Sequence, residues 1–291
     1  MAHKRDLAKG RFLTYLSAME RHSQIRLYVT APLSVGAEVI LDKEQAHYLG
    51  TVMRKSVGTK LAVFNGKDGC YLAEVTEMSR KSAHLIILSL QEAQWSSPDI
   101  WLLFAPVKKA RLDFMAQKAT ELGASVIWPV RTDFTQVKAV KDDRLLANAI
   151  EAAEQTERLD IPDIRTYSDL SDILASWPVD RALIFCDERL AESHRITDHD
   201  KTPSEKSDHF SDALRNLSQI NSQKAAILIG PEGGFSMTEK QMIDDMPQSC
   251  GISLGPRILR ADTAAIAALS LYQAVCGDWP NSSSMKDHHQ M

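Results

Sequence analysis

Two glycine-rich turns constrain the fold of this chain more than any other feature of its sequence. The first reads GPEGGFS over residues 230–236, and the second reads LGPRILR over residues 254–260. Each turn follows a short apolar run and leads into a helical pattern, so each marks the end of a buried strand. Strands and helices that alternate in this way predict an α/β fold around a mainly parallel sheet, whose ligands bind at the carboxyl ends of the strands. The two turns therefore predict a ligand site.

The first turn has the composition of a site built from backbone rather than from side chains. Residues 225–229 predict a buried strand, and Ser236-Met237-Thr238-Glu239 fits a capping box that opens a helix. Gly233 and Gly234 let the main chain approach a ligand and present amide donors beside the helix start. The turn lacks the Gly-Lys-Ser/Thr of a P-loop and the spacing of a dinucleotide-binding fold. An ordinary glycine-rich connection remains the alternative for this motif taken alone.

Four segments of the chain, the two turns among them, resemble the SPOUT superfamily of S-adenosylmethionine-dependent RNA methyltransferases. The other two read QKATELG over residues 117–123 and EAAEQTER over residues 151–158, and the second turn extends as LGPRILRADTAAIAAL to residue 269. Over roughly residues 26–275, their order and spacing are similar to the family that methylates N3 of a uridine in 16S (small-subunit) ribosomal RNA.

The resemblance implies the organisation of the protein as well as its reaction. It implies a C-terminal SPOUT domain with a trefoil knot, an N-terminal PUA-like RNA-binding domain, and S-adenosyl-L-methionine as cofactor. The implied partners are 16S ribosomal RNA or the small ribosomal subunit and a second copy of the chain. The last predicted helix, at residues 263–275, would lie in or beside the homodimer interface.

The resemblance also assigns residues to the cofactor site. The cofactor would lie among three loops, one after Phe185 and two at the glycine turns. Leu254, Ile258 and Leu259 would wall the adenine while main-chain groups read its edge, although simple core packing is the alternative for these side chains. The full implied set is Phe185, Glu188, Ile229, Gly230, Pro231, Glu232, Gly233, Gly234, Leu254, Gly255, Ile258 and Leu259.

The implied reaction narrows the candidates for catalysis. Uridine N3 carries a proton at neutral pH and becomes nucleophilic only as that proton leaves, so a base or an anion-stabilising cation is required. Glu232 and Asp262 are the carboxylates nearest the turns, and Arg260 is the best-placed cation. The sequence does not choose among these three. Glu154 and Gln155 are further candidates by resemblance, with a solvated helix face as the alternative.

The composition limits the class of protein. A chain of 291 residues, 44% of them hydrophobic, is long enough for two domains with their own cores. It contains no run of eighteen apolar residues and begins with a polar, charged segment, so we expect a soluble, cytoplasmic protein. The four cysteines stand far apart without a CxxC pair, so we expect reduced thiols and no metal site.

The charges are distributed unevenly along the chain. The net charge of −4 does not by itself indicate a nucleic-acid-binding protein. Residues 1–81, however, carry 13 lysines and arginines against 8 aspartates and glutamates, which leaves 21 against 30 for the rest. The N-terminal part is therefore the better candidate for contact with phosphates, with a solvated mixed surface as the alternative.

Residues 25–93 predict a small β-barrel domain, which the resemblance identifies as PUA-like. Short alternating or β-branched runs predict strands at 26–29, 39–41, 60–64, 70–75 and 83–90, with a hairpin turn at 65–69 and a helix at 44–54. The candidate RNA-binding residues are Arg26, His47, Arg54, Lys55 and Tyr71, with Lys108 beyond the domain. Packing is the alternative for Tyr71.

A polar break at residues 91–98 precedes the predicted methyltransferase domain at 99–278. Periodicity predicts helices at 111–122, 143–156 and 263–275, and strands at 100–105, 125–130 and 182–186. A polar insert near 190–224 is expected to be a mobile loop, and residues 279–291 a polar tail. Residues 1–24 form an N-terminal extension, for which a start at Met19 and a basic RNA-contacting arm both remain open.

Two positions depart from the pattern of the family. Ala261-Asp262-Thr263-Ala264 stands where Thr-Glu-Thr-Ala is usual, which keeps a carboxylate but shortens it by one methylene. Phe134 occupies the place of a usual arginine, so an RNA contact by that arginine does not carry over.

Other functions remain as alternatives. They are a SPOUT methyltransferase acting on another RNA, such as transfer RNA, and a noncatalytic RNA-binding assembly factor. A nicotinamide-dependent dehydrogenase lacks its sequence fingerprint.

Overall fold

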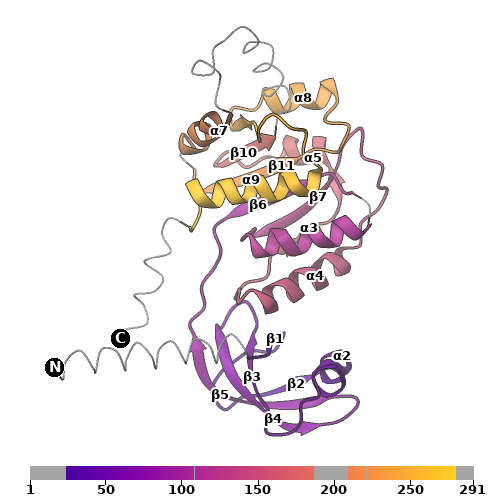
Figure 1. The fold of residues 1–291 in the computed structure, drawn as a ribbon, viewed down its shortest axis with the longest axis vertical. Coiled ribbons are helices and arrows are strands. Elements are labelled where there is room, and N and C mark those ends of the chain that lie inside the picture. The colour runs from indigo at the N-terminus through magenta and orange to yellow at the C-terminus, as the bar shows by residue number, and fades with distance from the viewer. Residues whose placement is uncertain (1–23, 108, 187–208, 221, 280–291) are drawn as a thin grey trace, which may run out of the picture. The chain divides into compact units, whose positions relative to one another are not determined.

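The computed structural model describes residues 24–107, 109–186, 209–220 and 222–279. The chain divides into two compact units, drawn in Figure 1. The N-terminal unit comprises the described residues up to Ser96 together with Glu157–Asp160. The C-terminal unit comprises Ser97–Thr156 and the described residues from Ile161 onward.

The N-terminal unit is built on a five-stranded sheet with the order β1-β3-β4-β5-β2. The strands are β1 (Arg26–Tyr28), β2 (Glu38–Leu41), β3 (Lys60–Phe64), β4 (Cys70–Met78) and β5 (Ala83–Glu92). β1 pairs in parallel with β3, whereas the other described neighbours are antiparallel. Inward side chains such as Leu41, Leu61 and Leu85 are fully buried in one core. The prediction of a small β-rich N-terminal domain is confirmed.

The turn between β3 and β4 has the hydrogen bonds expected of a hairpin turn. The helical segment before β3 differs in part from the prediction. The amides of Lys67 and Asp68 donate to Asn65 Oδ1 over 3.0 and 2.9 Å and close the turn. The helix predicted over 44–54 is instead α2 (Lys43–His47), followed by the π-helical turn η1 (Tyr48–Val52). The predicted helix is therefore confirmed over residues 44–52, but its second half is π-helical and it ends two residues early, where a glycine and two β-branched residues at 50–52 are weak α-helix formers.

The C-terminal unit is built on a seven-stranded sheet with the order β12-β10-β11-β6-β7-β8, and β9 pairs with β7. The strands are β6 (Ile100–Phe104), β7 (Val126–Arg131), β8 (Asp163–Ile164), β9 (Ser168–Asp169), β10 (Arg181–Cys186), β11 (Lys224–Ile229) and β12 (Ser249–Ile252). Every strand pair described in this sheet is parallel. The predicted α/β fold around a mainly parallel sheet is confirmed.

Helices cover both faces of this sheet (Figure 1). They are α3 (Lys109–Glu121), α4 (Asp142–Gln155), α5 (Leu170–Ala175), α7 (His209–Ser218), α8 (Met237–Asp244) and α9 (Ala261–Val275). Along β11, Ile227 and Ile229 pack in the core shared with α3 and α9, while Ala226 and Leu228 pack in the core shared with α5 and α8. Because both faces of the strand are buried, the sequence of β11 is one continuous apolar run.

One prediction for the C-terminal unit was wrong in part. The segment near 190–224 was expected to be a loop, but its second half contains α7, whose Ala213 and Leu217 are buried four residues apart in the core. This short apolar spacing is the helical signal that the polar composition concealed. The polar run at 197–205 lies outside the described residues.

The described part of the chain holds no helix long and apolar enough to cross a membrane. Within the same residues, no three histidine, cysteine, aspartate or glutamate side chains gather in a group that could hold a metal ion. All four cysteines are free thiols.

Candidate functional site

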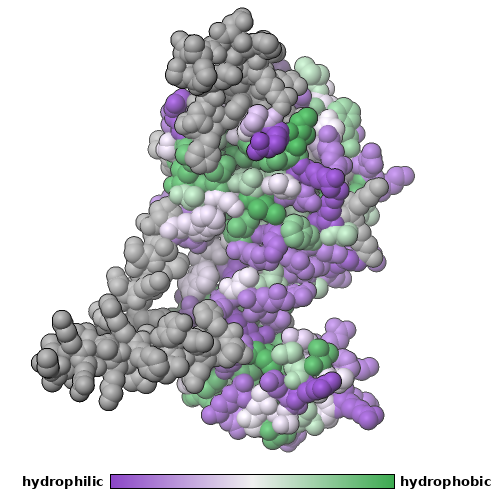
Figure 2. Space-filling model, in the orientation of Figure 1, coloured by the Kyte–Doolittle hydropathy of each residue, from purple (hydrophilic) through white to green (hydrophobic). Residues whose placement is uncertain are grey.

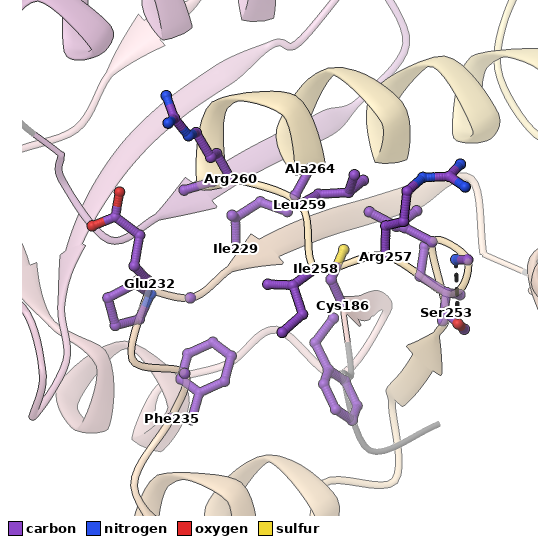
Figure 3. A pocket seen from close by; sticks show the side chains of 18 of the residues that line it. Cys186, Ile229, Glu232, Phe235, Ser253, Arg257, Ile258, Leu259, Arg260 and Ala264 are labelled. Carbon is purple, nitrogen blue, oxygen red and sulfur yellow. Dashed lines mark hydrogen bonds between the residues drawn. The ribbon is translucent and has the colours of Figure 1, made fainter. Parts of the chain in front are cut away.

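Three neighbouring parallel strands end at one edge of the C-terminal sheet, and the end of β10 and the turns after β11 and β12 line a single cavity. β10, β11 and β12 end at Cys186, Ile229 and Ile252. Because the strands are parallel, both glycine turns lie at the same edge, as Figure 3 shows. The cavity has a volume of about 220 Å³. The lining residues expected from the sequence are Phe185, Ile229, Gly230, Pro231, Glu232, Gly234, Leu254, Gly255, Ile258, Leu259 and Arg260.

The turn after β11 is held by its own backbone and by a buried aromatic side chain. The amide of Gly234 donates to the carbonyl of Pro231 over 2.8 Å, and Gly234 has a φ of +71°. Phe235 is buried, and its ring lies 3.0 Å from the place where a Cβ on Gly230 would stand. A side chain at Gly230 would therefore collide with the ring that anchors the turn.

A buried carboxylate ties this turn to a second loop. Ser236 caps α8, and Glu239 accepts a hydrogen bond from the Ser236 amide through Oε2 over 2.9 Å. The other oxygen, Glu239 Oε1, accepts from the amide of Asp133 over 2.8 Å. Glu239 is only 7% exposed. One carboxylate thus fixes the start of α8 against the loop that follows β7, a contact that the capping-box pattern alone did not reveal.

Several side chains of the turn after β12 are exposed. The amide of Gly255 donates to Ser253 Oγ over 3.4 Å, and Gly255 has a φ of +101°. Ile258 is 77% exposed, and Arg257 and Arg260 are exposed as well. In Figure 3, Glu232 and Arg260 lie at one end of the cavity, while Arg257 and Ser253 lie at the other. The second turn therefore supplies two cations and an apolar side chain to the cavity mouth.

Arg111, which lies outside the glycine turns, is close to both candidate carboxylates, Glu232 and Asp262. Its Nη1 lies 3.0 Å from Glu232 Oε1, and its Nε lies 3.9 Å from Asp262 Oδ2. Asp262 also accepts the amide of Thr263 over 2.9 Å at the start of α9. Arg111 was not predicted from the sequence, although α3 follows β6 and so begins at the same edge of the sheet as the turns. Among the described residues, Arg260 has no ion-pair partner.

Cys186 contributes a neutral wall to the cavity. Burial raises the pKa of its thiol to about 12. The thiol therefore remains protonated at neutral pH and behaves as a small apolar group. Lys240 and Phe235 also line the cavity, and neither was predicted from the sequence.

Several residues expected in the site lie elsewhere. Gly233 does not line the cavity, and a Cβ added to it would meet the Phe134 side chain at 3.5 Å. Asp262 does not line the cavity. Its carboxylate lies near Arg111 instead. Glu154 and Gln155 are at the end of α4 and do not line the cavity either. Glu188 lies outside the described residues.

The candidate RNA-binding residues of the N-terminal unit fall into two groups. Arg26 packs inside the unit, since its Nη2 donates to the carbonyl of Arg158 over 3.2 Å and its guanidinium lies 4.9 Å from the centre of the Phe64 ring. Tyr71 is half-buried against the core. The exposed members are His47, Arg54 and Lys55, while Lys108 lies outside the described residues.

The visible face of the N-terminal unit mixes hydrophilic and hydrophobic residues, as Figure 2 shows. Val52 and Val57 are both 58% exposed and flank Arg54 and Lys55 in the sequence. The segment 52–57 therefore presents two exposed cations, whose charge suits contact with the phosphates of an RNA, beside two exposed valines.

Comparisons with known proteins agree with this arrangement. A family model described as an RNA methyltransferase domain matches residues 94–273, and a model described as an RNA methyltransferase PUA domain matches residues 41–88. The ribosomal RNA small subunit methyltransferase E of Rickettsia conorii is 29% identical over 246 residues, which cover 84% of this chain and 93% of that protein.

Two solved structures are similar over nearly their whole length. The ribosomal RNA small subunit methyltransferase E of Neisseria gonorrhoeae, bound to S-adenosyl methionine, has a TM-score of 0.73 and 27% identity, covering 88% of this chain and 99% of that one. A methyltransferase of Legionella pneumophila, in complex with its bound cofactor SAM, has a TM-score of 0.73 and 31% identity with the same coverage. Since the RNA methyltransferase model spans more than half of the chain, the protein belongs to the RNA methyltransferase family.

Proposed function

We propose that this protein transfers a methyl group from S-adenosyl-L-methionine to N3 of a uridine in 16S ribosomal RNA. The observation that carries the proposal is the convergence of both glycine turns and Arg260 on one cavity at the carboxyl edge of a parallel sheet. This is the edge at which α/β proteins bind their ligands. The names of the relatives, which act on small-subunit ribosomal RNA, support the choice of substrate.

The residues of the cavity fit S-adenosylmethionine. Leu254, Ile258 and Leu259 supply apolar walls suited to an adenine ring. Apart from the adjoining residues, no atom of the described part of the chain lies within 4 Å of the places where a Cβ on Gly234 or Gly255 would stand, so the main chain of both turns is accessible to a ligand. When bound, the cofactor supplies an electrophilic methyl group on a positively charged sulfur. Glu232, at the end of the cavity near Arg260, would favour that positive charge.

Arg260 is the residue best suited to activate the uridine. The negative charge that develops on the uracil as N3 loses its proton needs a nearby cation. Arg260 lines the cavity and is the N-cap residue of α9, whose N-terminal backbone amides also favour negative charge. Its guanidinium has no ion-pair partner among the described residues, so it is available to the substrate.

Glu232 and Asp262 remain candidates for accepting the proton. In the structure, Glu232 is paired with Arg111, but the two side chains are 65% and 37% exposed. An ion pair this exposed contributes only about 0–1 kcal/mol. An entering uridine can therefore displace Arg111 from Glu232 at little cost. Asp262 is less exposed and further from the cavity wall, so it is the weaker candidate.

RNA capture and dimer formation complete the proposal. The exposed Arg54 and Lys55 of the N-terminal unit would hold phosphates. The protein would act in the cytoplasm as a homodimer with a knotted C-terminal unit, as the resemblance implies. Because Ala264, Ala265 and Ala268 of α9 pack in the core of their own unit, an interface at α9 would use the opposite face, with Ile266 and Ala267. Light scattering that finds a fully active monomer would contradict this arrangement.

Mass spectrometry of ribosomal RNA nucleosides tests the proposed activity in cells. Cells with the gene should contain 3-methyluridine in 16S ribosomal RNA, and cells without it should lack this nucleoside. Loss of a methyl group from transfer RNA instead would identify the alternative substrate. Unchanged methylation in all RNA, together with a defect in small-subunit assembly, would indicate the noncatalytic assembly factor.

A further inference from the structure

Phe134, in the loop that follows β7, is an exposed aromatic side chain near the cavity. It is 52% exposed, although its neighbours Thr132, Asp133 and Thr135 are polar. Isolated exposed apolar residues are common on protein surfaces and need no explanation by themselves. The contacts of Phe134 and the way its loop is fixed distinguish it from such residues.

Phe134 packs against the first glycine turn. The position of a Cβ on Gly233 would lie 3.5 Å from Phe134 Cβ, 3.6 Å from Cδ2 and 3.7 Å from Cγ. Gly233 is adjacent in sequence to Glu232, which lines the cavity. One side of the Phe134 side chain therefore packs on the turn, and the rest is exposed to solvent next to the cavity.

Hydrogen bonds fix the loop that carries this side chain. The Thr132 amide donates to Thr135 Oγ1 and the Thr135 amide donates to the Thr132 carbonyl, both over 3.0 Å. The two hydroxyl oxygens lie 2.8 Å apart. Glu239 then joins this loop to the first turn through the amides of Asp133 and Ser236. Phe134 is thus held at a set position relative to the turn.

The chemistry of N3 methylation explains why an aromatic side chain is useful there. N3 lies on the Watson–Crick edge of uracil, so a reacting uridine must be unpaired and withdrawn from its neighbours. A base in that state has lost its stacking partners, and enzymes of this kind commonly replace them with aromatic side chains. We propose that Phe134 stacks on a nucleobase of the RNA substrate and that Glu239 is the positioning residue that holds it. This inference rests on the proposed function.

Replacement of Phe134 by leucine and by tyrosine separates stacking from packing. Phe134→Leu keeps an apolar contact with Gly233 but removes the ring, whereas Phe134→Tyr keeps the ring. Loss of one base–aromatic stack weakens binding roughly tenfold to a hundredfold. We therefore expect Phe134→Leu to lower affinity for unmethylated small ribosomal subunits by this amount and Phe134→Tyr to stay within about twofold of the wild type. S-adenosylmethionine affinity, measured by calorimetry, should be unchanged in both.

Glu239→Gln tests the positioning role. In glutamine, one of the two side-chain oxygens that accept from Asp133 and Ser236 is replaced by an NH2 group, which donates, so one of these two hydrogen bonds is lost. We expect Glu239→Gln to weaken binding of the small subunit, and to weaken it much less when Phe134 is already leucine, since both changes act on the same stack. Additive effects of the two substitutions would show that Glu239 does not act through Phe134.

Three results would overturn the stacking role. Wild-type affinity in Phe134→Leu would show that no base stacks on the ring. A parallel loss of S-adenosylmethionine affinity would show that Phe134 only supports the turn. An equal loss in Phe134→Tyr would show that an aromatic ring is not what matters. Binding is measured separately from methyl transfer, so a wild-type protein that binds small subunits without methylating them would refute the proposed function while leaving the stacking test intact.

Discussion

The first glycine turn of the cavity is fixed by buried groups, whereas the second presents exposed ones. Phe235 and Glu239 anchor the turn at 230–236, and both are nearly inaccessible to solvent. At 254–260, the side chains of Arg257, Ile258 and Arg260 are exposed. Both turns nevertheless rely on a glycine with positive φ, Gly234 in one and Gly255 in the other.

This difference indicates that the two turns have different roles. A turn held by buried hydrogen bonds and a buried ring keeps its shape before any ligand arrives, which lowers the entropy lost on binding. A turn with exposed side chains gains its contacts from the ligand and the substrate. Substitutions in the first turn should therefore change the free energy of unfolding, and those in the second should change binding or rate.

The largest effect is expected from Arg260→Ala in the second turn. Removal of a group that stabilises a developing anion typically lowers the rate constant about a hundredfold to a thousandfold. We expect a loss of this size in single-turnover methyl transfer, because the charge is needed mainly in the transition state. The free energy of unfolding should change by less than about 0.5 kcal/mol, as is usual for an exposed side chain.

Arg260→Lys is the matched control for that prediction. It keeps the positive charge at the cavity and should recover part of the lost rate. If Arg260→Ala reacts at the normal rate with saturating RNA, Glu232 becomes the better candidate for activating the uridine.

The next largest effect is expected from Gly255→Val. Valine at a φ of +101° is strained by about 1–3 kcal/mol. Because the turn is exposed, it should change shape to relieve the strain, and S-adenosylmethionine affinity should fall at least tenfold, by about 1.4 kcal/mol or more. Calorimetric titration measures this loss.

Gly36→Val provides a control with similar backbone geometry. Gly36 has a φ of +84° and open space around its Cβ position, but it lies in the N-terminal unit. Gly36→Val should strain the backbone about as much as Gly255→Val does and leave the affinity for S-adenosylmethionine unchanged. Equal cofactor affinity in folded Gly255→Val and wild-type protein would remove the second turn from the site.

Glu239→Gln tests whether the buried carboxylate stabilises the first turn. A buried amide donor left without its acceptor costs about 1–3 kcal/mol, so the free energy of unfolding should fall by that amount. Chemical denaturation measures it. Met237→Gln is a suitable control on the same helix, because Met237 is 80% exposed and its substitution should leave the free energy of unfolding almost unchanged. If Glu239→Gln is as stable as the wild type, the buried carboxylate does not hold the first turn.

The smallest effect is expected from Arg111→Gln. The pair that Arg111 forms with Glu232 is exposed, so its loss should lower the free energy of unfolding by less than about 1 kcal/mol. Raising the salt concentration should shrink the difference further, because screening weakens exposed pairs. A loss as large as that of Glu239→Gln would show that Arg111 belongs to the fixed framework of the turn.

Local patterns in the sequence predicted the features that neighbouring residues determine. The apolar run of β11, the capping box of Ser236 and Glu239 and the hairpin at Asn65 all appear as expected. Each depends on residues a few positions apart, where periodicity and turn chemistry are informative. The parallel order of the strands followed from alternating strand and helix patterns.

The same local patterns could not predict contacts between distant segments. Glu239 reaches Asp133 across 106 positions, and Arg111 reaches Glu232 across 121. Arg26 resembled an RNA contact by its place in the family pattern, yet its guanidinium packs on Phe64 and Arg158. A charged side chain looks the same in sequence whether it is solvated, paired or packed, and only the tertiary fold distinguishes these cases.

Methyl transfer to purified small ribosomal subunits is the most direct test of the proposed activity. Wild-type protein would be incubated with S-adenosylmethionine and subunits that lack the modification, and the RNA nucleosides would be identified by mass spectrometry. We expect 3-methyluridine to appear in 16S ribosomal RNA with the wild type, and Gly255→Val to produce it more slowly at limiting cofactor. Absence of 3-methyluridine with a wild-type protein that binds the cofactor, or a methyl group on another base, would contradict the account.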